Sequence, residues 1–196
     1  MSKLYFRYGA IGSGKSTALL QIAHNYNEKN MQVILIKPKV DTKGEKNVES
    51  GVGISRMVDV WIPKKVKFKK ILDLTNISAI IVDEAHFLSA NQVDELYEIS
   101  KLNDIPVFCY GLRCDFKMQG FPGSQRLLEL ADSIEELKSI CRCGGKATQS
   151  LRMKNGIPIF EGEQVLIDGE LDGITYDSVC GKCFLELREK YSSKTE

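Results

Sequence analysis

Short apolar runs recur along the first two thirds of the chain, separated by polar segments of helical character. The runs at 31–36, 77–82 and 107–110 carry mostly large apolar side chains, and residues 4–6 form a shorter run of the same kind. Apolar runs without alternation are typical of parallel strands that are covered on both faces. The pattern predicts an α/β fold in which strands and helices alternate along the chain.

Helical periodicity fills the segments between these runs. Leu19 and Ala23 fall on one face of a helix predicted at 15–29, which would pack on the sheet. Ser89 and Gln92 have the spacing of a capping box, which predicts a second helix running to about residue 103. We therefore expect a doubly wound parallel sheet. The remaining elements expected are a strand at 56–62, a short helix at 124–130 and a last strand at 133–140.

Two segments between these elements are polar or basic. Lys37-Pro38 is expected to stop the preceding strand, and 38–54 to form a mobile loop at the carboxyl edge of the sheet, where ligands bind in such folds. The basic run at 64–70 has lysines interleaved with Phe68, a composition that can bind nucleic acid. We favour a solvated helix face with the apolar residues turned inward, because the chain as a whole is nearly neutral.

Amino-acid composition and net charge limit the functional classes to which the protein can belong. The chain has 196 residues, of which 43% are hydrophobic and 27% charged, as in an average soluble protein. Its 27 Lys and Arg residues against 26 Asp and Glu residues give a net charge of +1, so no global charge favours nucleic acid or a membrane surface. The first residues contain no apolar segment of signal-peptide length, and we expect a cytoplasmic protein.

A glycine-rich segment follows the first predicted strand. Gly9 and Gly14-Lys15-Ser16 match the phosphate-binding P-loop pattern G-x-x-x-x-G-K-[ST], between a strand and a helix. Glycines let backbone N–H groups surround phosphate oxygens, the lysine reaches the outer phosphates and the serine hydroxyl binds Mg²⁺. A glycine-rich turn with a chance lysine is the alternative, and the flanking elements argue against it. The expected ATP-binding residues here are Gly9, Ala10, Ile11, Gly12, Ser13, Gly14, Lys15, Ser16 and Thr17.

Two carboxylates follow the strand at 77–82. Asp83 lies where P-loop enzymes place a second carboxylate for Mg²⁺, and Glu84 is next to it. The letters of 83–86, Asp-Glu-Ala-His, also spell a motif of nucleic-acid helicases. Helicases need two such domains and a nucleic-acid-binding surface, whereas this chain has room for one α/β domain and is nearly neutral.

Four of the six cysteines form two close pairs. Cys141 and Cys143 are separated by a 36-residue insert from Cys180 and Cys183. Pairs at this spacing predict a closed tetrahedral zinc site, which would be structural because four thiolates leave no position for water. Free buried thiols are the alternative. The zinc would staple a long loop with an extended stretch at 164–167, and this loop is expected to close over a ligand.

Taken together, these motifs resemble the zinc-containing, type II thymidine kinases, in their bacterial form. The likeness covers essentially the whole chain. It is carried by residues 14–17, Lys37-Pro38 with Asp41, and the segments 83–87, 111–116, 141–143, 161–165 and 176–180.

The resemblance implies a Mg²⁺-dependent transfer of the ATP γ-phosphoryl group to the 5′-hydroxyl of thymidine. It implies Glu84 as the general base, with Ser16, Asp83 and Asp41 at Mg²⁺, and His86 near ATP. It also implies a homotetramer and inhibition by dTTP. The thymidine pocket it implies comprises Ile11, Phe87, Leu112, Phe116, Phe121, Gln164, Val165, Ile167, Asp168 and Tyr176.

The expected fold is thus a RecA-like P-loop domain at 1–138, a zinc-ribbon-like and lid domain at 139–190, and a disordered tail at 191–196. Four positions depart from the family pattern and leave their roles open, namely Lys43, Gly51, His86 and Asp168. A kinase of another deoxynucleoside is the nearest alternative, because the sequence specifies the phosphate chemistry better than the identity of the nucleobase. A helicase-type ATPase and a non-enzymatic zinc-ribbon adaptor that binds nucleotide are the others.

Overall fold

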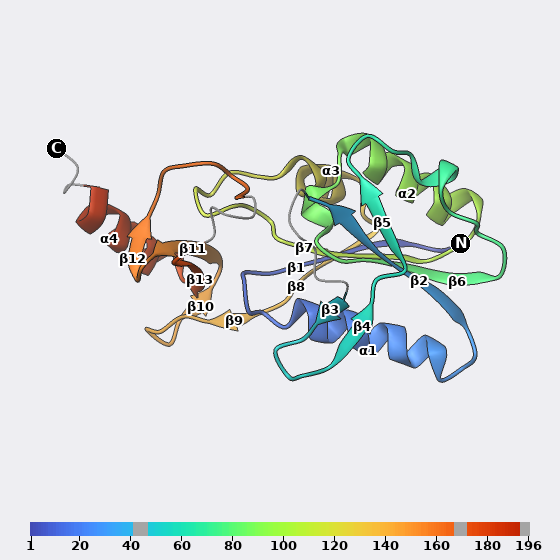
Figure 1. Cartoon of the computed structure of the whole chain (residues 1–196), viewed down its shortest axis with the longest axis horizontal. Helices are drawn as coiled ribbons and strands as arrows, with labels where there is room; N and C mark the ends of the chain where they lie inside the picture. Colours follow the sequence, from blue (N-terminus) through green and yellow to red (C-terminus); the bar gives the residue numbers. More distant parts are fainter. Residues whose placement is uncertain (41–46, 167–171, 193–196) are drawn as a thin grey trace.

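Six parallel strands form the main sheet of the described part of the chain, in the order β5-β2-β6-β7-β1-β8 (Figure 1). The structure is a computed structural model that describes residues 1–40, 47–166 and 172–192. The parallel α/β architecture expected from the apolar runs is confirmed. The strands of this sheet are β1 (Leu4–Tyr8), β2 (Gln32–Lys39), β5 (Val60–Pro63), β6 (Ile77–Val82), β7 (Val107–Gly111) and β8 (Ser133–Glu136).

Helices cover both faces of this sheet. The helix α1 (Lys15–Asn27) lies on one face, and α2 (Ala90–Leu102) and α3 (Pro122–Leu130) lie on the other (Figure 1). Side chains of β6 alternate between two apolar clusters. Ile81 packs in the cluster beneath α1, and Val82 packs in the cluster beneath α2 and α3. This two-sided burial explains why the strands carry continuous apolar runs instead of alternating ones.

The start of α2 agrees with the predicted capping box. The Gln92 N–H donates to Ser89 Oγ over 3.3 Å, and the Ser89 N–H donates to Gln92 Oε1 over 3.0 Å. Two backbone donors at the helix start are therefore satisfied by side chains. None of the described helices combines the length and apolarity needed to cross a membrane.

The expectation that Lys37-Pro38 stops β2 is wrong. The strand continues to Lys39, and Pro38 is in register with Ile62 of β5. On its other side, β2 pairs with β6 only as far as Ile36. From residue 37 onward β2 is therefore paired on one side only, which is where a strand tolerates a proline without an N–H.

Part of the segment expected as a mobile loop at 38–54 contains regular structure. An antiparallel hairpin joins β3 (Asn47–Glu49) to β4 (Ser55–Met57), while 41–46 lie outside the described residues. The single strand expected at 56–62 is two strands in different sheets, β4 and β5. Between them, the Asp59 carboxylate accepts the N–H of Leu35 over 2.7 Å and separates the two strands.

The helix expected in the basic run is reduced to the single 3₁₀ turn η1 (Phe68–Lys70). The Phe68 side chain is fully buried as expected, but Ile71 is 41% exposed. The Phe68 N–H donates to the buried carboxylate of Glu95 on α2 over 2.6 Å. This tertiary hydrogen bond fixes the chain direction at a point where local propensity alone favoured a longer helix.

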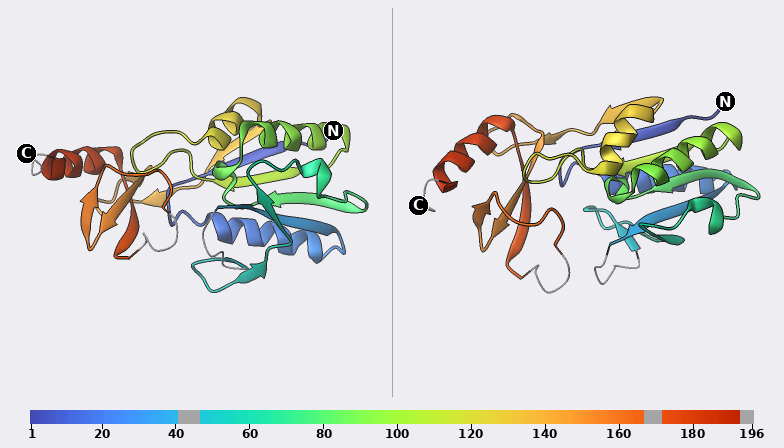
Figure 2. Two further views of the ribbon diagram at one scale, coloured as in Figure 1. Left: turned by 45° about the horizontal axis from the view of Figure 1, so that its top comes forward. Right: turned by 90° about the horizontal axis from the view of Figure 1, so that it is seen from above.

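Residues 139–166 and 172–192, called here the cysteine lobe, lie beyond the carboxyl ends of the sheet strands (Figure 2). The last strand expected at 133–140 is split between β8 and this lobe. The Asn155-Gly156 turn is present, with both residues at positive φ, but the stretch at 164–166 is not a strand. The lobe contains β9 (Ser139–Ile140), β10 (Lys146–Ala147), β11 (Gln149–Lys154), β12 (Ile157–Ile159), β13 (Ile174–Val179) and α4 (Gly181–Ser192).

Candidate active site and metal centre

The P-loop joins the end of β1 to the start of α1. Gly12 and Gly14 have φ of 75° and 78°, values in the left-handed region that favours glycine. The Lys15 ammonium donates to the carbonyl oxygens of Gly9 and Ala10 over 3.2 and 2.8 Å. Burial lowers the pKa of Lys15, against the opposing effect of the nearby Glu84 and Asp83 charges. The loop thus has the backbone conformation and the cation of a phosphate-binding site.

Two adjacent carboxylates follow β6, as the sequence predicted. Asp83 is only 4% exposed. Burial, and then the charge of Glu84, raise its pKa to about 7, while the Lys37 ammonium 3.9 Å from Oδ2 opposes the rise. Glu84 is more accessible and has φ 50° and ψ 36°, a left-handed conformation that is costly for a side-chain-bearing residue. Such strain is found where the surrounding structure holds a functional side chain in place.

Close packing by Gly123 holds this strained segment. Glu84 is followed by the 3₁₀ turn η2 (Ala85–Phe87), and α3 begins directly against that turn. A Cβ atom at Gly123 would lie 2.6 Å from the Ala85 carbonyl oxygen and 2.7 Å from that of Leu88. Only glycine therefore allows α3 to approach the backbone that carries Glu84.

His86 is enclosed in this part of the site. The Leu112 N–H donates to its Nδ1 over 3.2 Å, so the proton of the neutral ring lies on Nε2. Glu84 Oε2 is 3.4 Å from the same Nδ1, and without a proton between them this contact is not a hydrogen bond. Burial, and then the Lys15 charge, lower the pKa of His86 to about 3. Its ring packs on Phe87 and Phe121, with centroids 4.0 and 4.6 Å away.

A cavity of ≈ 930 Å³ connects the P-loop to the cysteine lobe. Gly9, Ala10, Ser13 and Asp83 do not line it, and Asp41, Ile167 and Asp168 lie outside the described residues. The predicted site residues in its wall are Ile11, Gly12, Gly14, Lys15, Ser16, Thr17, Glu84, His86, Phe87, Leu112, Phe116, Phe121, Gln164, Val165 and Tyr176.

Several residues of this wall were not named as site residues from the sequence. Arg152 is one of the largest fully buried side chains, and Asp115 is 3% exposed. Their hydrogen bonds involve residues up to 49 positions away, so no local spacing reveals them. Strand alternation is a partial signal for Arg152. Leu151 of β11 packs in the apolar cluster of the lobe, so the side chains of Ser150 and Arg152 on either side of it face the cavity. The wall residues that were not named as site residues from the sequence are Lys37, Pro38, Val40, Gly51, Val52, Trp61, Asp115, Ser150, Arg152 and Leu166.

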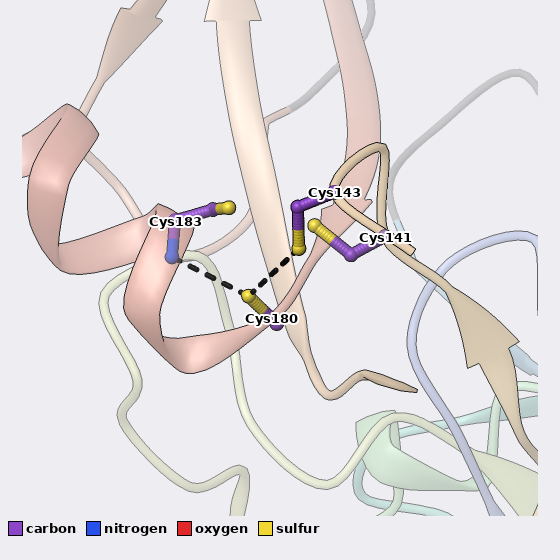
Figure 3. Close-up of side chains that lie close together, drawn as sticks. All are labelled: Cys141, Cys143, Cys180 and Cys183. Atoms are coloured by element: carbon purple, nitrogen blue, oxygen red, sulfur yellow. Dashed lines mark hydrogen bonds between the residues drawn. The ribbon is translucent and has the colours of Figure 1, made fainter. Parts of the chain in front are cut away.

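The four cysteines converge in the cysteine lobe, as predicted. Their Sγ atoms all lie within 4.8 Å of one another and point toward a common centre (Figure 3). The Sγ atoms of Cys143 and Cys180 are 3.6 Å apart. Four thiolates about 2.3 Å from one Zn²⁺ have sulfur atoms about 3.8 Å apart, so the cluster fits a tetrahedral metal ion.

Backbone donors also favour thiolate in this cluster. The N–H groups of Cys143 and Cys180 lower the pKa of Cys141 to about 6. The pKa of Cys183 is raised to about 12, because its thiol is hydrogen-bonded to the other sulfur atoms. The Cys183 N–H also donates to Cys180 Sγ over 3.4 Å (Figure 3). Thiolate is the form that binds a metal ion, so a dication bound here would displace the proton of Cys183.

Comparison with known proteins agrees with this geometry. The family model described as "Thymidine kinase" matches residues 2–184. A thymidine kinase of Legionella pneumophila (strain Lens) is 41% identical over 201 residues, covering 100% of this chain and 93% of the relative. That of Ruegeria pomeroyi is 42% identical, covering 95% of each chain, and that of Chromobacterium violaceum is 42% identical, covering 94% of this chain and 98% of the relative. The chain therefore belongs to the thymidine kinase family.

Proposed function

We propose that the protein transfers the γ-phosphoryl group of ATP to the 5′-hydroxyl of thymidine, giving dTMP and ADP. The observation that carries this proposal is the continuous cavity in which Lys15 and Glu84 lie between the P-loop and an aromatic wall. Phosphoryl transfer depends mainly on positioning and charge neutralisation, so a site that holds both substrates side by side is sufficient.

ATP would bind at residues 9–17. Ser16 and Asp83 would hold Mg²⁺, with support from Asp41, and these oxygen donors fit a hard cation. The buried Asp83 is consistent with this role, because its raised pKa reports a site where an added positive charge would be favourable. When bound, Mg²⁺ would neutralise charge on the phosphates.

Glu84 would accept the proton of the 5′-hydroxyl. Its carboxylate is the more accessible of the adjacent pair and reaches the cavity, whereas Asp83 does not line it. The left-handed backbone at Glu84 projects this side chain from the end of β6. A general base must lie within hydrogen-bond reach of the proton that it removes, and a rigid backbone keeps it there.

Thymine would occupy the aromatic end of the cavity. Phe87 and Phe121 meet edge to face at 5.6 Å, and Phe116 and Tyr176 complete an apolar wall. The segment around Gln164 and Val165 would bind the edge of the base. Deoxyuridine would be a secondary substrate, and other deoxynucleosides are the alternative that a substrate survey resolves.

The cysteine cluster would hold a structural Zn²⁺, and we propose a division into a P-loop domain at 1–138 and a zinc and lid domain at 139–190. A separate apolar cluster around Leu151, Val179 and Phe184 supports this division. We also propose a cytoplasmic homotetramer inhibited by dTTP. Family membership supports these properties, and the exposed Ile54 and Met57 offer apolar surface for subunit contacts.

The test is ATP consumption with Mg²⁺ and each nucleoside in turn, using the wild-type protein and Glu84→Gln. Thymidine should stimulate turnover most, and Glu84→Gln should lower kcat by about 10²- to 10⁴-fold while leaving ATP binding intact. Glu98→Gln, at an exposed carboxylate that pairs with Lys69, is the control. Stimulation by single-stranded nucleic acid and not by thymidine would overturn the proposal.

A further inference from the structure

Arg152 on β11 is a buried cation in the wall of the cavity. Its side chain is almost completely enclosed, with the residue 2% exposed. None of the ion pairs between described residues includes it, and the neighbouring Asp177 on β13 pairs with Arg142 instead. A buried charge is costly unless its hydrogen bonds are satisfied. The hydrogen-bond partners of Arg152 therefore indicate which parts of the structure it positions.

The guanidinium group hydrogen-bonds to three separate residues. Nε donates to the Tyr176 hydroxyl over 2.9 Å, NH1 donates to the Glu163 carbonyl over 2.7 Å, and NH2 donates to the Gln164 carbonyl over 3.1 Å. A planar fork with donors in fixed directions suits this task, and an ammonium group cannot reproduce it. Arg152 thus connects β11 to β13 and to the segment at 163–164.

The same group also stacks on an aromatic residue from a different part of the chain. The Cζ atom lies 3.7 Å from the centre of the Phe116 ring, close enough for a desolvated cation–π contact. Phe116 follows β7 and belongs to the sheet region, residues 1–136. Arg152 therefore spans the boundary between the sheet region and the cysteine lobe.

A second connection runs parallel to this one. Gln164 Nε2 donates to Asp115 Oδ2 over 3.0 Å, and Asp115 Oδ1 accepts the N–H groups of Lys117 and Gln119, each over 2.8 Å. Asp115 is held by its own loop, so Gln164 is fixed against a rigid acceptor. The Lys117 ammonium also donates to the Gly162 carbonyl over 2.9 Å. The segment at 162–164 is thereby tied to the loop that carries Phe116.

We propose that Arg152 is a positioning residue that sets the thymidine-binding wall. It holds the Tyr176 hydroxyl, the backbone at 163–164 and the Phe116 ring in one fixed arrangement. Since all three neighbours line or adjoin the nucleoside end of the cavity, the proposal rests on the proposed function. The P-loop lies at the other end and makes no hydrogen bond to Arg152, so ATP binding is independent of this residue.

The test compares Arg152→Lys and Arg152→Met with Arg126→Lys. Arg126 is a surface arginine that pairs with Asp94 and Glu129, which makes it a matched control. Each Arg152 variant should raise the KM for thymidine about 10- to 100-fold, with the KM for ATP changed less than about 2-fold. Equal losses for both substrates, or an unchanged thymidine KM in a folded variant, would overturn the proposal.

Two further measurements separate the positioning role from a folding defect and from the proposed activity. One uses a milder variant, and the other measures proteolysis without nucleoside. Tyr176→Phe removes only the hydroxyl that Arg152 Nε contacts and should raise the thymidine KM a few-fold. Without nucleoside, Arg152→Lys should be cleaved by thermolysin before Val165 and Leu166 at least about 10-fold faster than Arg126→Lys, because the preceding carbonyls are released. Equal cleavage rates would refute the positioning role even if wild-type protein failed to phosphorylate thymidine.

Discussion

The sheet region and the cysteine lobe fold by different means, although both line one cavity. The sheet region has an apolar cluster on each face of a parallel sheet, and these clusters enclose Phe6, Leu96 and Ile81 among others. Within the described residues the lobe has one small cluster, which includes Leu151, Phe184 and Cys141, with Cys180 and Cys183 packed against it. A small core supplies little stability by itself and usually needs a metal or disulfides.

Because the two regions are stabilised differently, the two ends of the cavity are also held in place by different interactions. The P-loop and Glu84 are placed by strand ends whose positions follow from the packed sheet. The proposed nucleoside wall around Tyr176 and Gln164 is placed by a few polar contacts and by the lobe that carries the cysteine cluster. The phosphate end should therefore resist changes that loosen the nucleoside end, and three experiments test that separation.

The largest expected effect is the loss of the metal cluster. Cys180→Ser, or removal of zinc by a chelator, should unfold the cysteine lobe, because zinc binding contributes about 10 kcal/mol or more to such sites. Hydrogen exchange should show loss of protection in β11 and β13 and retained protection in β1 and β6. Thymidine binding should be lost while ATP binding persists.

Cys114→Ser is the matched control for this experiment, since Cys114 is not one of the four clustered residues. It should retain both metal and protection. Equal loss of protection in the sheet region after chelation would show that the two regions do not fold separately.

An intermediate effect is expected for Gly123→Ala. The new methyl group would be forced against the backbone carbonyls of η2, which costs about 1–3 kcal/mol. It would also shift Glu84, so kcat should fall with little change in the KM for thymidine. Urea unfolding and steady-state kinetics measure the two effects.

Gly181→Ala in the cysteine lobe is the control, because nothing lies within 4 Å of a Cβ atom there. Its stability and kcat should match the wild type. If Gly123→Ala were equally silent, the packing of α3 on η2 would not position the base.

The smallest effect is expected at the edge of the sheet, where Asp132 joins Lys101 on α2 to the N–H of Leu4. Burial alone would raise the Asp132 pKa, but the Lys101 hydrogen bond and the Leu4 N–H outweigh it and lower the pKa below its usual value. A carboxyl group whose pKa is lower in the folded than in the unfolded protein stabilises the fold at pH values above its unfolded pKa, near 3.9. This stabilisation is lost as the pH falls through the folded-state pKa. Asp132→Asn should cost about 1 kcal/mol at pH 7 and almost nothing below about pH 3.

Thermal unfolding between pH 3 and pH 8 measures this difference. Asp94→Asn is the control, because its partner Arg126 and Asp94 itself are more exposed and contribute less. A cost for Asp132→Asn that does not change with pH would exclude a contribution from its charge.

The sequence predicted those parts of the fold that depend on local pattern. Apolar runs placed β6 correctly, Ser89 and Gln92 placed the start of α2, and the cysteine spacing identified the four clustered residues. Each of these signals lies within a few residues of chain or in a motif with fixed chemistry. The motifs are also sufficient to identify the family.

Features that depend on distant partners were not predicted. Pro38 stays in a strand because the pairing of β2 with β6 ends two residues earlier, at Ile36, and the basic run forms only a 3₁₀ turn where Glu95 accepts the Phe68 N–H. Arg152 is buried because Tyr176 and Gln164 are brought to it by the fold. No spacing along the chain encodes these contacts, so a pattern of residue types could not reveal them.

The position of β1 has a consequence for synthesis of the chain. β1 precedes the other described strands along the chain, yet its two neighbours are β7 and β8, with Leu4 in register with Val107 and Tyr5 in register with Ser133. On the ribosome, its apolar side chains remain without a sheet partner until β7 has been made. Pairing over such long sequence separations is slow and leaves an aggregation-prone segment exposed. The strand that leads into the P-loop is thus translated early and paired late, so we expect the nascent chain to be more prone to aggregation than the folded protein.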